Sequence, residues 1–435
     1  MDSQKDFSSP VYRRARISYI LYAMFEYFVL LLISDAFLAK LLSNVGFKNS
    51  EIGVISSLIS LAFIVQLFSI LLAKKRGSKK KMILILSTVG QMLFLALYLL
   101  PFLSIDSSLR KALVYLFIIG AYVSKYLVAT FLFQWANSYV DPNRRATFSA
   151  TLTIISLIGG TVYSFAIAAV FNWFEEMNRI KDGFLFLAIV ILISNLFVFL
   201  CLLCIKKEKS ESAEAIPRKK LSEILKNTLG NKNFRRLILI SIIWKSAQYF
   251  SVGFMGTFKT DTLGNGLSMS VLTVQIIAIL GSFVSLAVTR PFGIYSDKRS
   301  FASGLYLSLF FEIAAYLCCA FTTTGTWFLI IGYTVFYAIA GAGNSQNSVN
   351  ITYSYINSDY LAEALALKNS ISGVFGFLSA VLAGILLDAI QNSGNTFLGI
   401  PVFGQQVLAV ISALLCVICI IYMRVTIMKE KVIKQ

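Results

Sequence analysis

Apolar segments of about 20 residues recur along the whole chain, and each is long enough to cross a hydrocarbon core of roughly 30 Å. Hydrophobic residues make up 57% of the sequence and charged residues only 14%, which is far from the balance of a soluble domain. The sequence therefore predicts an all-α membrane protein with 12 transmembrane helices. We place them at residues 17–42, 52–73, 82–103, 112–136, 146–171, 183–205, 237–258, 271–288, 301–322, 327–350, 361–390 and 402–423.

The second half of the chain repeats landmarks of the first half. In each half a glycine precedes one apolar segment, a second glycine lies inside a later segment, and a Cys-x-x-Cys pair closes the last segment. The corresponding positions are Gly46 and Gly266, Gly160 and Gly376, and Cys201 and Cys416, which are 220, 216 and 215 residues apart. A repeat of that length indicates a duplicated half-protein, because solenoid units are much shorter.

The duplication predicts the domain organisation. Residues 1–205 form an N-terminal six-helix half, residues 206–236 a cytoplasmic linker, and residues 237–435 a C-terminal six-helix half. Because each half has an even number of helices, the halves are parallel and related by an axis along the membrane normal, as in transporters with a site between the halves. The linker is too short for a nucleotide-binding domain and the chain has no Walker phosphate loop, which disfavours an ATP-driven pump.

The formal net charge of +18 comes from basic residues gathered on one side of the predicted bundle. The side that holds both termini carries 29 of the 39 Lys and Arg residues, and the opposite loops carry 7. This positive-inside bias places both termini in the cytoplasm of a multi-pass plasma-membrane protein, such as one of a bacterial inner or cell membrane. The basic charge suits anionic lipid headgroups, and no nucleic-acid partner is expected. No segment resembles a cleaved signal peptide.

The six cysteines all lie in apolar segments, and the chain has no histidine. We interpret the cysteines as packing residues rather than as metal ligands or a redox pair. Because the sequence also lacks a nucleophile–base set, it predicts no enzyme activity, no cofactor and no metal.

Three segments carry a resemblance to a known family. Residues 290–298 (Arg-Pro-Phe-Gly-Ile-Tyr-Ser-Asp-Lys) look like the G-x-x-x-D-[RK] loop after helix 8 of the major facilitator superfamily, with Ser300 in place of the usual closing Gly. The equivalent first-half residues, 70–77, keep the basic character but have Ile70 and Lys74 where Gly and Asp are expected. Residues 141–146 look like the family's turn between helices 4 and 5. With six plus six helices, the chain resembles this superfamily over essentially its whole length.

The resemblance implies an intracellular latch between the halves. In this fold Asp297 is expected to face the start of helix 5 (146–171), where the unpaired N–H groups and the helix dipole stabilise a carboxylate. Because the first half has Lys74 in place of the acid, the latch is expected to be asymmetric and to depend on Asp297. The alternative is that residues 297–299 form a solvated turn. The predicted gate residues are Arg290, Gly293, Asp297, Lys298 and Arg145.

Five ionisable residues lie deep in predicted helices, where a charge is costly and usually functional. They are Glu26, Asp35, Lys125, Lys245 and Glu312. The resemblance implies that helices 1, 4, 7 and 10 line the cavity, which favours the first four residues. Helix 9 (301–322) is peripheral in that family, so Glu312 is expected to be structural or to reach the headgroups. Glu26 and Asp35 are nine residues apart and would point to opposite faces of a straight helix.

These charges allow two interpretations. Lys125 and Lys245 occupy comparable places in the two halves and would bind a carboxylate, a phosphate or another anion. Alternatively the two lysines form internal salt bridges with Glu26 and Asp35, and a buried pair that breaks on binding is also a coupling device. Glu26 is then a candidate for proton coupling, and a coupling proton or sodium ion is among the expected partners.

Polar and aromatic residues complete the predicted site. Trp244, Gln248 and Tyr249 surround Lys245 on helix 7 (237–258), where the two rings offer a stacking surface. Helix 10 (327–350) carries four amides within residues 344–350; these suit sugar hydroxyls, amino-acid groups or nucleoside edges, and amide bonding between helices is the structural alternative. The predicted substrate-binding and coupling residues are Glu26, Asp35, Lys125, Trp244, Lys245, Gln248, Tyr249 and Asn344.

The sequence as a whole predicts a monomeric secondary active or facilitative transporter. It would move a small polar or anionic solute across the lipid bilayer by rocker-switch alternating access. Residues 156–163 have two glycines and no proline, unlike the helix-5 signature of drug exporters, which favours uptake by symport or uniport. A drug/proton antiporter is the alternative within transport, and a solute sensor or lipid-handling protein of the same fold is the alternative outside it.

Overall fold

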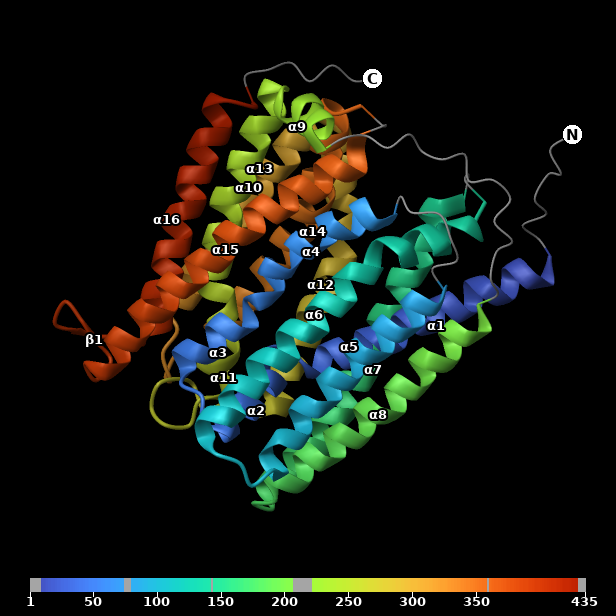
Figure 1. Cartoon of the computed structure of the whole chain (residues 1–435). Coiled ribbons are helices and arrows are strands. Elements are labelled where there is room, and N and C mark those ends of the chain that lie inside the picture. Colours follow the sequence, from blue (N-terminus) through green and yellow to red (C-terminus); the bar gives the residue numbers. More distant parts are fainter. Residues whose placement is uncertain (1–8, 74–79, 142–143, 206–220, 358–359, 429–435) are drawn as a thin grey trace, which may run out of the picture. The chain divides into compact units, whose positions relative to one another are not determined.

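The computed structural model describes residues 9–73, 80–141, 144–205, 221–357 and 360–428, and these are almost entirely helical (Figure 1). Within them, eleven helical stretches are long and apolar enough to cross a membrane. Helix α14 (Leu329–Tyr355) is a twelfth candidate by its length of 27 residues, because about 20 residues suffice to span; its amide-rich run makes it less apolar than the others. The predicted all-α fold with 12 transmembrane helices is confirmed.

The described residues form two compact units, residues 1–45 with 68–218 and residues 46–67 with 219–435. In the first unit, α1 (Pro10–Leu32) packs against α7 (Arg145–Glu176) and α8 (Ile180–Cys204). Helix α5 (Lys80–Leu99), continued by the short 3-10 helix η1 (Leu100–Phe102), packs against α6 (Ser107–Ser138) and α8. A buried cluster that includes Tyr22, Val128, Phe131 and Leu202 fills the space between these helices.

In the second unit, α13 (Phe301–Ala320) packs against α14 and α16 (Gly404–Val425), and α10 (Lys232–Ser251) packs against α15 (Leu361–Asn392) and α16. Helix α12 (Val271–Lys298) packs against α14. The smaller elements of this unit are α3 (Asn49–Ser56), the first part of α4 (Leu58–Ala73), α9 (Leu221–Leu229), the 3-10 helix η3 (Val252–Phe254), α11 (Met255–Thr260) and a hairpin of β1 (Thr396–Phe397) and β2 (Ile400–Pro401).

Residues 46–67 come early in the sequence but belong to the second unit. Helix α3 lies against α15, η3 and α11. The absence of a side chain at Gly53 allows this approach, because a Cβ there would lie 2.0 Å from the ring of Phe254. Asn49 donates to Asp261 Oδ2 at 2.6 Å, and Lys48 pairs with Asp388 at 3.5 Å. The predicted boundary between the halves, which follows the chain order, stays a prediction.

The first predicted segment is not one straight helix. Helix α1 ends at Leu32, and α2 (Asp35–Val45) begins after a break at residues 33–34. Asp35 has a φ of +44°, in the left-handed region that Asp tolerates better than most residues. Because of this break, Glu26 and Asp35 do not lie on one straight helix, and the prediction that they share one was wrong.

Residues 290–298 do not form a loop, as the family motif had suggested. They are the last part of α12, which continues through Pro291 to Lys298. The turn that follows consists of Arg299 and Ser300, and Ser300 caps α13 by accepting from the Ser303 N–H at 3.0 Å. The segment can stay helical because Arg290, Asp297 and Lys298 are exposed and polar, so the helix simply extends beyond its apolar part.

The repeated glycines Gly160 and Gly376 make the same kind of helix contact in the two units. A Cβ on Gly160 of α7 would lie 2.4 Å from the ring of Tyr27 on α1, and a Cβ on Gly376 of α15 would lie 2.7 Å from the ring of Tyr249 on α10. Each glycine therefore lets a tyrosine from the first helix of its half approach the backbone of the fifth. This equivalence supports the duplication inferred from the sequence.

Candidate functional site

A hydrogen-bonded network in the second unit joins residues that the sequence had singled out on different helices. Its centre is Glu312 of α13, which is 1% exposed. The carboxylate accepts from Trp244 Nε1 at 2.8 Å, from Asn344 Nδ2 at 2.9 Å and from the Tyr316 hydroxyl at 3.1 Å. Three donors around one carboxylate suit its ionised form, which is an acceptor only.

The sequence predicted that Glu312, on a peripheral helix, is structural or reaches the headgroups. Its burial excludes the headgroups, and its hydrogen bonds to three residues agree with the structural alternative. The signal was present, because Glu312 interrupts an otherwise apolar helix; family analogy about the position of helix 9 outweighed it. Asn344 is 2% exposed and is held on both sides, by Glu312 and by the Ser308 hydroxyl, which donates to Asn344 Oδ1. The structure thus uses this amide for bonding between α13 and α14.

Lys245 lies beside this network on α10. Its ammonium donates to Gln248 Oε1 at 2.7 Å and lies over the rings of Trp244 and Tyr249, at 4.6 and 5.5 Å from their centroids. Gln248 in turn donates to the hydroxyl of Tyr337 at 2.7 Å. Among the described residues of the second unit, Lys245 has no carboxylate within salt-bridge distance, although the buried Glu312 carboxylate is close enough to interact with its charge. Aromatic faces attract a cation, so the two rings and Gln248 hold the ammonium without a direct ion pair.

In the first unit, Lys125 of α6 pairs with Glu26 of α1 at 3.3 Å. This confirms one of the two internal salt bridges that the sequence had allowed. Both side chains line a small cavity together with Tyr22 of α1 and Gln91 of α5. Asp35 is not on this helix face, because it lies at the start of α2, where its carboxylate is in the first helical turn.

Lys368 of α15 is a third buried lysine, which the sequence gave no role. Its ammonium donates to the Ser348 carbonyl at 3.0 Å, the Ser348 hydroxyl at 2.8 Å and the Thr352 hydroxyl at 3.2 Å. All three of its N–H groups are thereby satisfied by α14, so Lys368 fastens α15 to α14.

The predicted gate residues lie at the end of α12. Arg290, Asp297 and Lys298 are exposed, and Gly293 faces Gln346 of α14 across 3.6 Å, measured from the position of a Cβ. Helix α7 begins at Arg145, whose side chain lies outside the described part of the structure. The predicted latch between Asp297 and the start of α7 therefore stays a prediction.

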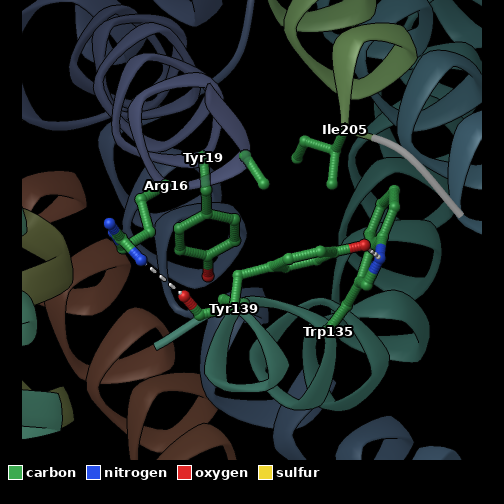
Figure 2. Close-up of a pocket in the computed structure, with 7 residues that line it drawn as sticks. Arg16, Tyr19, Trp135, Tyr139 and Ile205 are labelled. Carbon is green, nitrogen blue, oxygen red and sulfur yellow. Dashed lines mark hydrogen bonds between the residues drawn. The ribbon is translucent and has the colours of Figure 1, made fainter. Parts of the chain in front are cut away.

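Another depression lies in the first unit between the start of α1 and the end of α6 (Figure 2). Arg16 donates to the Tyr139 carbonyl at 3.0 Å, and Trp135 donates to the Tyr139 hydroxyl at 2.9 Å. It has no room for a water molecule, so it is a packed junction rather than a solute site. Within the described residues, no three His, Cys, Asp or Glu side chains come together as a metal site.

Comparison with known proteins decides the family. Residues 17–298 match the sequence profile of the Major Facilitator Superfamily, which is more than half of the 435 residues. The chain belongs to the major facilitator superfamily. Membership confirms the resemblance seen in residues 290–298 and points to a transporter rather than an enzyme. A comparison with curated proteins finds no match.

Several solved structures share the superfamily fold with this chain. The nucleoside transporter NupG superposes with a TM-score of 0.70 at 15% identity, over 94% of this chain and 99% of that chain. A bacterial homologue of the human lysosomal transporter Spinster, inward-facing and unoccupied, gives 0.68 at 15%, over 99% and 100%. A bacterial homologue of the iron transporter ferroportin, in an inward-facing state, gives 0.63 at 14%, over 94% and 98%. At such identities the likeness establishes the fold.

Proposed function

We propose that this major facilitator superfamily protein takes up a small polar solute that carries an anionic group. It would do so by symport or uniport, through rocker-switch alternating access in a plasma membrane with both termini in the cytoplasm. The positive-inside distribution of Lys and Arg supports this orientation, and the repeat of two six-helix halves supports alternating access.

The choice of an anionic solute rests on the contacts that Lys245 makes. The predicted anion site contained Lys125 and Lys245, but Lys125 is already paired with Glu26, and Lys368 is fully bonded to α14. Lys245 alone among these three lysines has neither a direct ion pair nor a full set of hydrogen bonds: its direct contacts are one neutral oxygen and two aromatic rings, and Glu312 interacts with it only at longer range. An anionic group would gain a charge-assisted hydrogen bond there, with Gln248 and the rings of Trp244 and Tyr249 contacting the rest of the solute.

The fold alone does not determine which solute is transported. Among the similar structures, one is named as a nucleoside transporter and another as a homologue of an iron transporter, so one scaffold serves chemically distinct solutes. The residues of the site must decide, and in this chain they combine one ammonium, an amide and two aromatic rings. The buried Glu312 behind Trp244 would repel a second anionic group, which favours a solute with a single anionic group.

Thermal stabilisation of the purified protein tests the proposal. A ligand present at about 100 times its dissociation constant stabilises the folded state by roughly 2.7 kcal/mol. We expect hits among monocarboxylates or monophosphates of a panel that also contains sugars, uncharged nucleosides and organic cations. Lys245→Met should abolish the shift, whereas Lys245→Arg should retain part of it because the charge is kept. Hits confined to uncharged or cationic compounds would contradict the proposal.

A further inference from the structure

The cavity beside Glu26 contains a buried amide oxygen that the fold leaves without a donor. Gln91 of α5 and Ser87, one turn before it, are each 7% exposed and line this cavity together with Glu26 and Lys125. Within the described residues, Gln91 Oε1 has no hydrogen-bond partner, whereas Ser87 Oγ lies beside the hydroxyl of Tyr22. Buried polar atoms are nearly always bonded, so an unbonded amide oxygen facing a cavity with a carboxylate calls for an explanation.

The position of these oxygens is set by the backbone around them. Asn195 of α8 donates to the Gln91 carbonyl at 3.1 Å and so fixes this turn of α5. The neighbouring Gly90 is packed closely, since a Cβ there would lie 3.2 Å from Ser124 and 3.3 Å from the Ala121 carbonyl on α6. The oxygens of α5 are therefore held against the face of α6 that carries Lys125.

The ion pair beside them is loose and reachable. The 3.3 Å separation of Lys125 Nζ and Glu26 Oε1 exceeds the roughly 2.7–2.9 Å of a strong charge-assisted hydrogen bond. The two side chains are 23% and 19% exposed, so the described residues do not fully enclose the ammonium. The cavity holds about one water molecule or a bare ion and is too small for an organic solute.

We propose that this cavity is a binding site for one monovalent alkali cation, with sodium as the reference ion. Glu26, Gln91 Oε1 and Ser87 Oγ supply oxygen ligands, which hard cations prefer, and the Tyr22 hydroxyl lies next to both Glu26 and Ser87. Lys125 is paired with the Glu26 carboxylate until the cation displaces the lysine ammonium. The cation and the lysine therefore compete for one carboxylate, and cation binding releases a positive charge from the pair.

This site would give the proposed transporter its coupling ion, and in that respect it rests on the proposed function. Cation binding can nevertheless be measured without any solute or transport. The two proposals can therefore fail independently, because a protein that moves no solute would still be stabilised by sodium, and a transporter without this site would not.

The test is the melting temperature of the purified full-length protein in NaCl compared with choline chloride at equal ionic strength. We expect a saturable rise with sodium. Gln91→Leu should remove the rise, and it should fold well because an apolar group replaces a buried amide whose oxygen is unbonded. Gln405→Leu is the matched control, since Gln405 of α16 is 1% exposed and its amide is also unbonded among the described residues. It should leave the sodium response unchanged.

Competition makes a second, opposite prediction. Lys125→Met removes the competitor, so the half-maximal sodium concentration should fall about tenfold, equivalent to about 1.4 kcal/mol. A sodium response that survives Gln91→Leu, or that Lys125→Met leaves unchanged or weakens, would overturn the site. Absence of any response to lithium, sodium or potassium would also overturn it, as would stabilisation that follows only pH and so reports protonation of Glu26.

Discussion

Trp244 donates its indole N–H to Glu312 across 2.8 Å, from α10 to α13. This bond joins a residue expected to contact the solute to a carboxylate expected to be remote from it. Because Asn344 and Tyr316 donate to the same carboxylate, Glu312 determines how the ring of Trp244 is held. The aromatic surface over which Lys245 lies is therefore organised by a buried charge on another helix.

Replacing Glu312 by glutamine should destabilise the protein. The amide keeps the shape but offers one acceptor oxygen and places an NH₂ group toward a donor, so a buried donor loses its partner at a cost of about 1–3 kcal/mol. Glu176→Gln is the control, because Glu176 is exposed at the end of α7 and, among the described residues, accepts only from Asn172. Thermal unfolding of both variants checks this; equal melting temperatures would show that the Glu312 network contributes no stability.

The space around two glycines predicts opposite effects of a Gly→Ala substitution: Gly53 lies at the contact between α3 and η3, and Gly341 lies in open space on α14. Gly53→Ala should destabilise by about 1–3 kcal/mol, because its Cβ would meet the fully buried ring of Phe254. Gly341→Ala should be neutral or stabilise by up to about 1 kcal/mol, because a Cβ there meets nothing within 4 Å on α14. Denaturation of the purified variants measures both, and a stable Gly53→Ala protein would contradict the packing described for residues 46–67.

Two lysine–carboxylate pairs should differ in how much each contributes to the free energy of unfolding. Lys40 of α2 contacts Glu175 of α7 at 2.6 Å with side chains 12% and 27% exposed, whereas Lys48 and Asp388 are 3.5 Å apart and 63% and 36% exposed. Lys40→Met should cost about 1–3 kcal/mol, and Lys48→Met no more than about 1 kcal/mol. Unfolding in low and high salt distinguishes them, and the reverse order of stabilities would refute this assignment.

The latch attributed to Asp297 predicts a conformational effect without a large loss of stability. Asp297 is exposed at the end of α12, so Asp297→Asn should fold normally. If its charge holds the cytoplasmic side shut against the start of α7, the substitution should shift the population toward the inward-open state. Double electron–electron resonance distances between labels on the two halves would measure the shift. Unchanged distance distributions would support the alternative of a solvated helix end.

Much of the architecture could be predicted because hydropathy and duplication act over long stretches of chain. Twelve apolar runs and a repeat near 216 residues were enough for the all-α membrane fold. The break of the first segment at residues 33–34 was missed, because both flanking stretches are apolar and only Asp35 marks the change. The helical state of residues 290–298 was missed because a family motif and Pro291 both suggested a loop.

The site was harder to predict because it depends on which helices are neighbours. The sequence identified Trp244, Lys245, Gln248 and Asn344 by depth and helical spacing, and all four lie in or beside one network. The two rings beside Lys245 were visible from its own helix, but the sequence could not show that Lys125 and Lys245 differ, since only packing decides that Glu26 pairs with Lys125 while no carboxylate in its own unit pairs directly with Lys245. The unbonded oxygen of Gln91 likewise appears only when α5 is placed against α1 and α6.

Uptake into proteoliposomes tests the central claim most directly, namely that Lys245 binds the anionic group of a transported solute. The anionic compound that most stabilises the purified protein would be supplied in labelled form to vesicles containing wild type, Lys245→Met or Lys245→Arg. We expect saturable uptake by wild type, a loss of at least about tenfold with Lys245→Met, equivalent to about 1.4 kcal/mol, and partial uptake with Lys245→Arg. Uptake by Lys245→Met equal to that of wild type, or binding without uptake by any variant, would contradict the account.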